Sequence, residues 1–167
     1  MTFKPKSPST RPPPPTLKDA LNEARAVSGA GVVRPTSSAP GSMHPAGRKT
    51  IVVVDDDASM RARLRVALEA FYDVIEAKDG MEAAELAGRI APPAMFVCDV
   101  VMPRVDGFTL AKILKSNPLM KRVPIMFVSS RNSPQDVTQA MVLGACQYVL
   151  KTVPIGEIVA KIRKIVV

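Results

Sequence analysis

The chain has 167 residues and a formal net charge of +8, from 23 basic and 15 acidic side chains. This length suffices for one domain with a complete hydrophobic core. The sequence has no apolar stretch of transmembrane length, no signal-peptide segment and no metal-type cysteine spacing, which argues against a membrane protein and a secreted disulfide scaffold. We therefore expect a cytoplasmic protein in which Cys98 and Cys146 are buried, reduced thiols.

Residues 1–48 are predicted to be a disordered, basic, proline-rich tail. Residues 1–50 hold nine of the 16 prolines and contribute +6 of the net charge, with few large apolar side chains. Such a composition cannot bury enough surface to offset the entropy of ordering. A solvated linker is the favoured interpretation. Nucleic-acid binding is not expected, because Phe3 is the only aromatic residue of the tail and offers no stacking platform.

Two features of the tail leave alternatives open. Pro12 to Pro15 form a polyproline tract, which is either a rigid spacer or a ligand for an aromatic groove, the spacer being favoured. Residues 16–27 have the pattern of a short amphipathic helix with Thr16 as its cap. Because so short a helix is marginal in isolation, the segment either forms transient structure or folds on docking.

From residue 49 to residue 167, apolar runs alternate with amphipathic segments, and this part is predicted to be one folded domain. Near-continuous apolar runs are typical of parallel strands that are covered on both faces. The strands are expected at about 51–55, 73–76, 95–99, 123–128 and 146–150. The helices are expected at about 58–70, 79–89, 106–116, 134–143 and 154–166. Five β/α pairs in succession predict an α/β domain with a parallel sheet.

Start signals and apolar periodicity support these helices. Asp79 precedes Glu82 by three residues, as in a capping box, and Ser133 precedes Pro134, which suits a first helical turn. The first helix is expected to bury one face, formed by Met60, Leu64, Ala67, Leu68 and Phe71. The last helix has more apolar residues than one buried stripe needs: Ile155, Ile158, Val159, Ile162, Ile165 and Val166. Some of these are candidates for an interface, although core packing is the default for most.

Polar side chains stand at the ends of four predicted strands. Asp55 and Asp56 end the first, Asp99 the third, Ser129 the fourth and Lys151 the fifth. Because the carboxyl ends of parallel strands share one edge, where ligands bind, these groups are expected to converge. Crowded carboxylates repel each other unless a cation lies among them, and Mg²⁺ is the natural cation for carboxylates with a phosphate. The sequence therefore predicts a phosphorylation pocket.

The segments that carry these groups resemble, in order, the CheY-like receiver domain of bacterial two-component response regulators. They are Val52–Asp57, Cys98–Gly107, Val128–Ser130 and Tyr148–Lys151. The Met-Pro-x-x-Asp-Gly stretch after an aspartate-ended strand, together with the other three segments, makes the signal specific. The resemblance covers about residues 49–167. It implies a doubly wound (βα)5 fold of the flavodoxin/CheY-like type.

The resemblance also implies a role for each polar residue. Asp99 is the expected phosphoacceptor, and Asp55 and Asp56 are the expected acidic pair that holds Mg²⁺ with Asp99 and the backbone carbonyl of Val101. Lys151 is expected to pair with a phosphoryl oxygen as a point charge.

Two further residues form the expected switch. Ser129 is expected to hydrogen-bond another phosphoryl oxygen, and Tyr148 to move between exposed and buried rotamers in step with it. Asp57 and Asp106 are expected to cap helices rather than to bind a ligand.

Two departures from the family pattern bear on this site. Lys151 is followed by Thr152, where the family has a proline after a cis bond. A cis bond to another residue costs about 2.5–4 kcal/mol, so the loop is either strained or rerouted through a trans bond, and the reach of Lys151 is open. Val101 and Arg131 occupy the two positions that, in this family, flank the path of the water molecule that hydrolyses the acyl phosphate. An apolar branched side chain and a bulky cation there predict slow self-dephosphorylation.

These observations predict a single-domain response regulator in a two-component phosphorelay, which receives a phosphoryl group on Asp99 from a sensor histidine kinase or a histidine phosphotransfer protein. It is not an enzyme beyond Mg²⁺-dependent self-phosphorylation and slow self-dephosphorylation. Phosphorylation would shift a two-state equilibrium on the face of the fourth helix, fifth strand and fifth helix, which binds a target protein or a second copy.

Two alternatives stand beside this prediction. The first is a degenerate receiver that acts as a constitutive interaction module. The second, a haloacid-dehalogenase-like phosphatase, is disfavoured because residues 55–59 (Asp-Asp-Asp-Ala-Ser) depart from the DxDx[TV] nucleophile motif.

Overall fold

Five apolar segments form one parallel sheet. They are β1 (Thr50–Val54), β2 (Asp73–Ala77), β3 (Met95–Cys98), β4 (Ile125–Ser129) and β5 (Gln147–Leu150). Their order is β2-β1-β3-β4-β5, and every pairing is parallel. This is the doubly wound order of the flavodoxin/CheY type, which confirms the expected fold class. Its strand order reverses between β1 and β3, and this reversal opens the crevice where such folds bind ligands.

The computed structural model describes residues 47–167. The predictions for the tail, including the polyproline tract and the possible helix at 16–27, fall outside the described residues except at Gly47 and Arg48.

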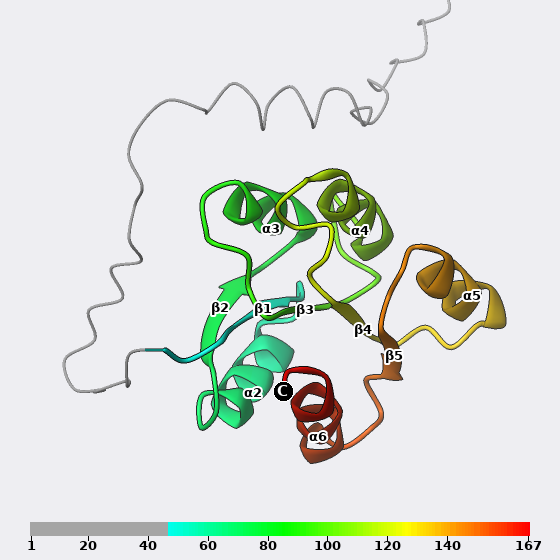
Figure 1. Ribbon diagram of the computed structural model, residues 1–167. Coiled ribbons are helices and arrows are strands. Elements are labelled where there is room, and N and C mark those ends of the chain that lie inside the picture. Colours follow the sequence, from blue (N-terminus) through cyan, green and yellow to red (C-terminus); the bar gives the residue numbers. More distant parts are fainter. Residues whose placement is uncertain (1–46) are drawn as a thin grey trace, which may run out of the picture. The chain divides into compact units, whose positions relative to one another are not determined.

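Helices cover both faces of the sheet (Figure 1). They are α2 (Ala58–Leu68), α3 (Gly80–Ala87), α4 (Gly107–Ser116), α5 (Pro134–Val142) and α6 (Ile155–Ile165). One apolar cluster joins the sheet to α3, α4 and α5, and a second joins its other face to α2 and α6. In β1, Val52 and Val54 belong to the first cluster, whereas Ile51 and Val53 belong to the second. Burial on both faces explains why the central strands are apolar without alternation.

Most of the expected helix caps are present. Asp57 accepts a hydrogen bond from Ser59 N, Asp106 accepts one from Thr109 N, and Asp79 accepts hydrogen bonds at the start of α3. The observed elements begin and end within a few residues of the expected limits. β4 begins two residues later than expected, at Ile125 after Pro124, because proline has no N–H to donate to the ladder.

Two expectations about burial are wrong. Phe71 follows the end of α2, is 44% exposed and stacks against the Arg163 guanidinium, because the chain has left the helical path. Cys146 precedes the edge strand β5 and is exposed, whereas Cys98 in a central strand is buried. The last helix follows the default of core packing: Ile158, Val159, Ile162 and the capping Val166 are buried, and Ile155 and Ile165 pack, partly buried, against the same core cluster.

Among residues 47–167, no helix is long and apolar enough to cross a membrane.

Candidate functional site at the carboxyl edge of the sheet

Strand register brings the predicted site residues to one edge of the sheet. In the central pair, Val54 of β1 lies opposite Cys98 of β3, so the residues that follow them, Asp55 and Asp99, are neighbours. On the other side, the end of β4 pairs with the end of β5, and Lys151 follows directly.

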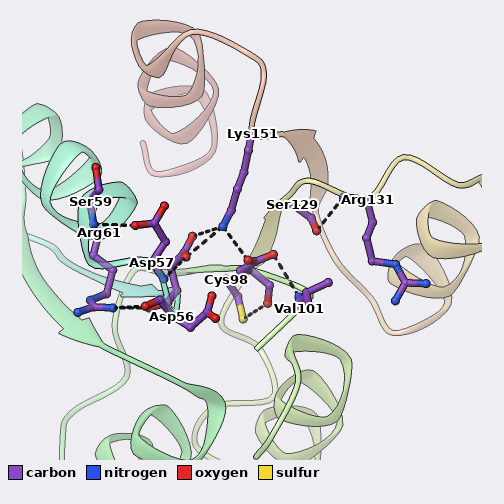
Figure 2. Close-up of polar contacts among 11 residues, drawn as sticks. Asp56, Asp57, Ser59, Arg61, Cys98, Val101, Ser129, Arg131 and Lys151 are labelled. Carbon is purple, nitrogen blue, oxygen red and sulfur yellow. Dashed lines mark hydrogen bonds and ion pairs between the residues drawn. The ribbon is translucent and has the colours of Figure 1, made fainter. Parts of the chain in front are cut away.

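Lys151 joins the two buried carboxylates of this edge (Figure 2). Its ammonium nitrogen lies 2.8 Å from Oδ2 of Asp55 and 2.7 Å from Oδ2 of Asp99. The two carboxylates are 2% and 4% exposed. No peptide bond between residues 47 and 167 is cis, so the bond from Lys151 to Thr152 is trans. The question left open by the sequence is therefore answered, because Lys151 reaches the pocket over a trans bond.

Burial and neighbouring charges act in opposite directions on the pKa values of Asp55 and Lys151. Burial raises the pKa of Asp55, and hydrogen bonds from Lys151 and from the backbone N–H of Asp57 only partly offset that rise. For Lys151, burial lowers the pKa, but the hydrogen bonds to Asp55 and Asp99 and their charges outweigh burial, so its pKa is raised. The ammonium group therefore remains charged at neutral pH, while Asp55 is ionised at a cost in free energy.

The donor set suits a hard divalent cation. Carboxylate oxygens of Asp55, Asp56 and Asp99 lie within 4.8 Å of one another, and Asp56 is exposed to solvent whereas the other two are buried. Oxygen donors open to water on one side match Mg²⁺, which keeps several waters and takes few protein ligands. A cation here would also relieve the cost of ionising Asp55.

Asp99 is held at both of its ends. Its backbone N–H donates to Val54 O at 2.8 Å, and Oδ1 of its side chain accepts from Val101 N at 3.2 Å. The neighbouring thiol, Cys98, donates to the backbone oxygen of Asp99 at 3.1 Å, and burial raises its pKa well above the usual value. This thiol is therefore a neutral part of the core cluster.

Ser129 and Tyr148 are connected through the backbone of Arg131. The N–H of Arg131 donates to Ser129 Oγ at 3.3 Å, and its carbonyl oxygen accepts from the Tyr148 hydroxyl at 2.8 Å. Its guanidinium forms a two-point ion pair with Asp136 in the first turn of α5, at 2.9 Å for each contact. Figure 2 shows the Arg131 side chain pointing away from Lys151.

The sequence reasoning missed a residue that supports the acidic pair. Arg61 of α2 donates from its guanidinium to the carbonyl oxygens of Asp55 and Asp56, at 2.7 and 3.2 Å. Its side chain is 18% exposed and also pairs with Glu76 at 3.7 Å. In the sequence, Arg61 is only an arginine in the first turn of a helix, and that helix begins shortly after Asp55 and Asp56. No local rule distinguishes such a residue from a solvated arginine on the surface.

The family profile described as "Response regulator receiver domain" matches residues 51–163. Fold, site geometry and this match agree, and the chain belongs to the response regulator receiver-domain family. Receiver domains of this family are signalling modules of two-component systems.

Named relatives share the domain over part of their length. It is 37% identical to "Response regulator MprA" of Mycobacterium leprae over 68% of this chain and 49% of that protein. It is 36% identical to "Gliding motility regulatory protein" of Myxococcus xanthus over 81% of this chain and 16% of that protein. The chain spans between 16% and 51% of the length of these and the other curated relatives compared.

Solved structures share the fold. A putative response regulator of Chloroflexus aurantiacus is 30% identical, with a TM-score of 0.66 over 71% of this chain and 98% of that chain. The receiver domain of a sensor histidine kinase of Pseudomonas aeruginosa, solved with magnesium in its active-site cleft, has a TM-score of 0.65 over 71% of this chain and 98% of that chain. At 20% identity, the latter shows likeness of fold alone.

Proposed function

We propose that this chain is a phosphorylation-dependent signalling protein that receives a phosphoryl group on Asp99 from a sensor histidine kinase or a histidine phosphotransfer protein. The observation that carries the proposal is the contact of Lys151 with both Asp55 and Asp99, beside an exposed third carboxylate at the switch point of the sheet. A half-buried lysine between two buried carboxylates, beside a candidate cation site, is what phosphoryl transfer to a carboxylate requires.

In the proposed reaction, a carboxylate oxygen of Asp99 attacks the phosphorus atom of a phosphohistidine. A P–O bond forms while the P–N bond breaks, and the electron pair of that bond stays with the imidazole nitrogen. Lys151 is placed to neutralise a phosphoryl oxygen by exchanging one of its carboxylate contacts for it. Asp55, Asp56, Asp99 and the Val101 carbonyl are the proposed ligands of Mg²⁺, which when bound supplies charge neutralisation for the phosphoryl group.

The switch is proposed to begin at Ser129. Its hydroxyl group, which accepts a hydrogen bond from Arg131 N, would donate a hydrogen bond to a phosphoryl oxygen. Arg131 also contacts Tyr148 of β5 and Asp136 of α5. A shift of its backbone would therefore displace both contacts and so reach β5 and the first turn of α5.

The proposed target face lies on α5, β5 and α6, and its exposed apolar side chains come from α5. Val137, Met141 and Val142 are 38%, 45% and 81% exposed. A shallow groove of about 440 Å³ runs along the same helix, lined by Pro134, Gln135, Thr138, Gln139 and Val142. A target protein or a second copy of the chain is the proposed occupant of this face.

Slow loss of the phosphoryl group follows from the surroundings of Asp99. Val101 is 48% exposed and apolar, and the Arg131 guanidinium is bound to Asp136 rather than directed at the pocket. Neither side chain offers an acceptor that would orient a water molecule for attack. A constitutive, non-switching interaction module is the second function considered; the position of Lys151 does not favour it.

The test is intact-mass measurement of the purified protein with acetyl phosphate and Mg²⁺. We expect a gain of about 80 Da, its loss on chelation of the metal, and its absence in Asp99→Asn. Asp106→Asn, which alters an exposed helix cap next to the same loop, is the matched control and should still be modified. A wild-type protein that never gains mass, or an Asp99→Asn variant that does, would contradict the proposal. We also expect slow self-dephosphorylation, so a phosphorylated form that lasts only seconds would contradict that expectation.

A further inference from the structure

The loop between β3 and α4 contains a strained residue. Arg104 has a φ of 66° and is the only residue other than glycine with a positive φ among residues 47–167. It is the middle residue of a tight turn, because Val105 N donates to Pro103 O at 2.8 Å. Side chains are disfavoured in this conformation, and it persists only where the surroundings hold it.

A buried carboxylate holds this residue. The Arg104 guanidinium forms an ion pair with Asp79, whose side chain is 4% exposed and lies at the start of α3. Asp79 also accepts from Met81 N and Glu82 N, each at 2.9 Å. Burial by itself raises the pKa of Asp79, but the Glu82 N–H and the Arg104 contact outweigh burial, and its pKa is lowered. The carboxylate is thus a charged anchor.

The backbone of this loop is closely packed on both sides of the turn. On the α3 side, Gly80 N donates to Val105 O at 3.2 Å, and a Cβ on Gly80 would lie 2.4 Å from that oxygen. On the α4 side, Gly107 N donates to Val100 O at 3.0 Å, and a Cβ on Gly107 would lie 2.1 Å from the backbone oxygen of Asp99. Backbone therefore packs on backbone at both ends, and a change at the turn is transmitted to the residues before it.

Those residues include the acceptor carboxylate. Val101, in the same loop, donates its N–H to Oδ1 of Asp99 at 3.2 Å, which orients the oxygen opposite to the one that Lys151 contacts. The orientation of Asp99 toward Asp55 and Asp56 thus depends on where the loop holds this N–H.

We propose that the Arg104–Asp79 ion pair is a positioning device for the metal and phosphoryl-acceptor site, and that it acts by holding Arg104 in its strained turn. This inference rests on the proposed function. Arg104 and Asp79 are positioning residues, since they act through the loop and not on the reacting atoms. The ion pair joins the loop after β3 to the cap of α3, which is 25 residues earlier in the chain.

Two variants of Arg104 separate positioning from a charge effect. Arg104→Ala and Arg104→Gly both remove the positive charge and the ion pair, but only glycine adopts a positive φ without strain. Positioning therefore predicts that Arg104→Ala weakens Mg²⁺ binding about tenfold, as is typical for residues behind a metal's own ligands. Arg104→Gly should stay within about threefold of the wild type. Coulomb's law alone predicts that both variants bind Mg²⁺ more tightly and equally, because a cation has been removed.

The anchor is tested by Asp79→Asn. Asparagine caps a helix as well as aspartate does, so this change removes the ion pair and keeps the cap. We expect it to weaken Mg²⁺ binding about as much as Arg104→Ala, and the double variant Asp79→Asn/Arg104→Ala to be no worse than either single one. Arg122→Ala, which removes an exposed arginine near the amino end of β4, is the charge-matched control and should leave affinity unchanged.

Two measurements on the full chain decide the matter. Calorimetric titration with MgCl2 gives the affinity, and hydrogen exchange of the Gly80 and Gly107 amides, without metal, reports whether the loop has loosened. Support is weaker binding with faster exchange in Arg104→Ala and Asp79→Asn, and recovery of both in Arg104→Gly. Equal affinity in the alanine and glycine variants, tighter binding, or unchanged exchange would overturn the proposal. If the wild type binds no Mg²⁺, the proposed function fails first and this inference fails with it, whereas failure of the variants alone leaves the proposed function standing.

Discussion

At the scale of single residues, the site stores unfavourable free energy. Asp55 is 2% exposed and its pKa is raised by burial, so the folded protein ionises it at a cost. Lys151 offsets part of that cost but is shared with Asp99. Buried carboxylates of this kind are typical of sites where function opposes stability, since a carboxylate that binds a cation must be ionised.

Asp55→Asn should therefore stabilise the protein in the absence of a divalent metal. The folded protein binds the Asp55 proton more tightly than the unfolded chain does, so the contribution of Asp55 to stability falls as the pH rises from its usual pKa through the raised one. We expect the variant to be more stable than the wild type at pH 7, with a smaller advantage near pH 4. Urea denaturation with a chelator, repeated between pH 4 and pH 8, measures the difference.

Asp56→Asn is the control, because Asp56 is exposed and water already solvates its charge. Its effect on stability at pH 7 should be smaller than that of Asp55→Asn. An advantage of Asp55→Asn that shrinks as the pH rises would show that Lys151 more than offsets the burial of Asp55.

At the scale of elements, α4 is fixed to β3 by contact between backbones. Gly107 opens α4, and a Cβ there would lie 2.1 Å from the backbone oxygen of Asp99, the proposed phosphoacceptor. Gly107→Ala should therefore lower the free energy of unfolding by about 2–3 kcal/mol and impair the mass gain at Asp99. Chemical denaturation and the acetyl phosphate assay measure the two effects.

Gly156→Ala is the matched change in another helix. Nothing lies within 4 Å of a Cβ at Gly156, in the first turn of α6, so alanine meets no obstacle there. Its higher helix propensity should stabilise the protein by about 0.5–1 kcal/mol. If both alanine variants changed stability alike, close approach of α4 to β3 would not be the cause.

Helix α5 differs from α6 in how many of its apolar side chains are exposed to solvent. It keeps several apolar side chains exposed, whereas the isoleucine and valine side chains of α6 all pack in or against the core cluster. Its first turn is tied to the β4–α5 loop through Arg131 and Asp136. This helix therefore combines the exposed apolar surface of the proposed target face with a mechanical link to the pocket.

At the scale of the whole molecule, the predicted boundary between tail and domain at residues 48 and 49 has a direct test. Two apolar clusters on the faces of the sheet are contained within the receiver domain, and Arg48 already contacts the turn after α2. Deletion of residues 1–46 should therefore change the free energy of unfolding by less than about 0.5 kcal/mol and leave the mass gain at Asp99 intact. Loss of cooperative unfolding in the shortened chain would show that the boundary is wrong.

Much of the architecture follows from local sequence. Apolar runs of strand length, helix periodicity between them and caps such as Asp79 and Ser133 indicate five β/α units, and parallel connectivity then brings the strand ends together. Periodicity failed where the chain turned, as at Phe71, and where a strand lay at the edge of the sheet, as beside Cys146. Neither condition is visible in a local pattern.

The order of residues along this chain was enough to indicate the fold class, the family and the acids, hydroxyl and lysine of the candidate site, because strand ends carry their side chains to a shared edge whatever the details of packing. Only the tertiary structure decided that Lys151 reaches two carboxylates over a trans bond, that Arg61 supports the acidic pair and that Arg104 is paired with Asp79. Those contacts join segments through long side chains, whose direction depends on the packing of elements that local sequence patterns do not encode.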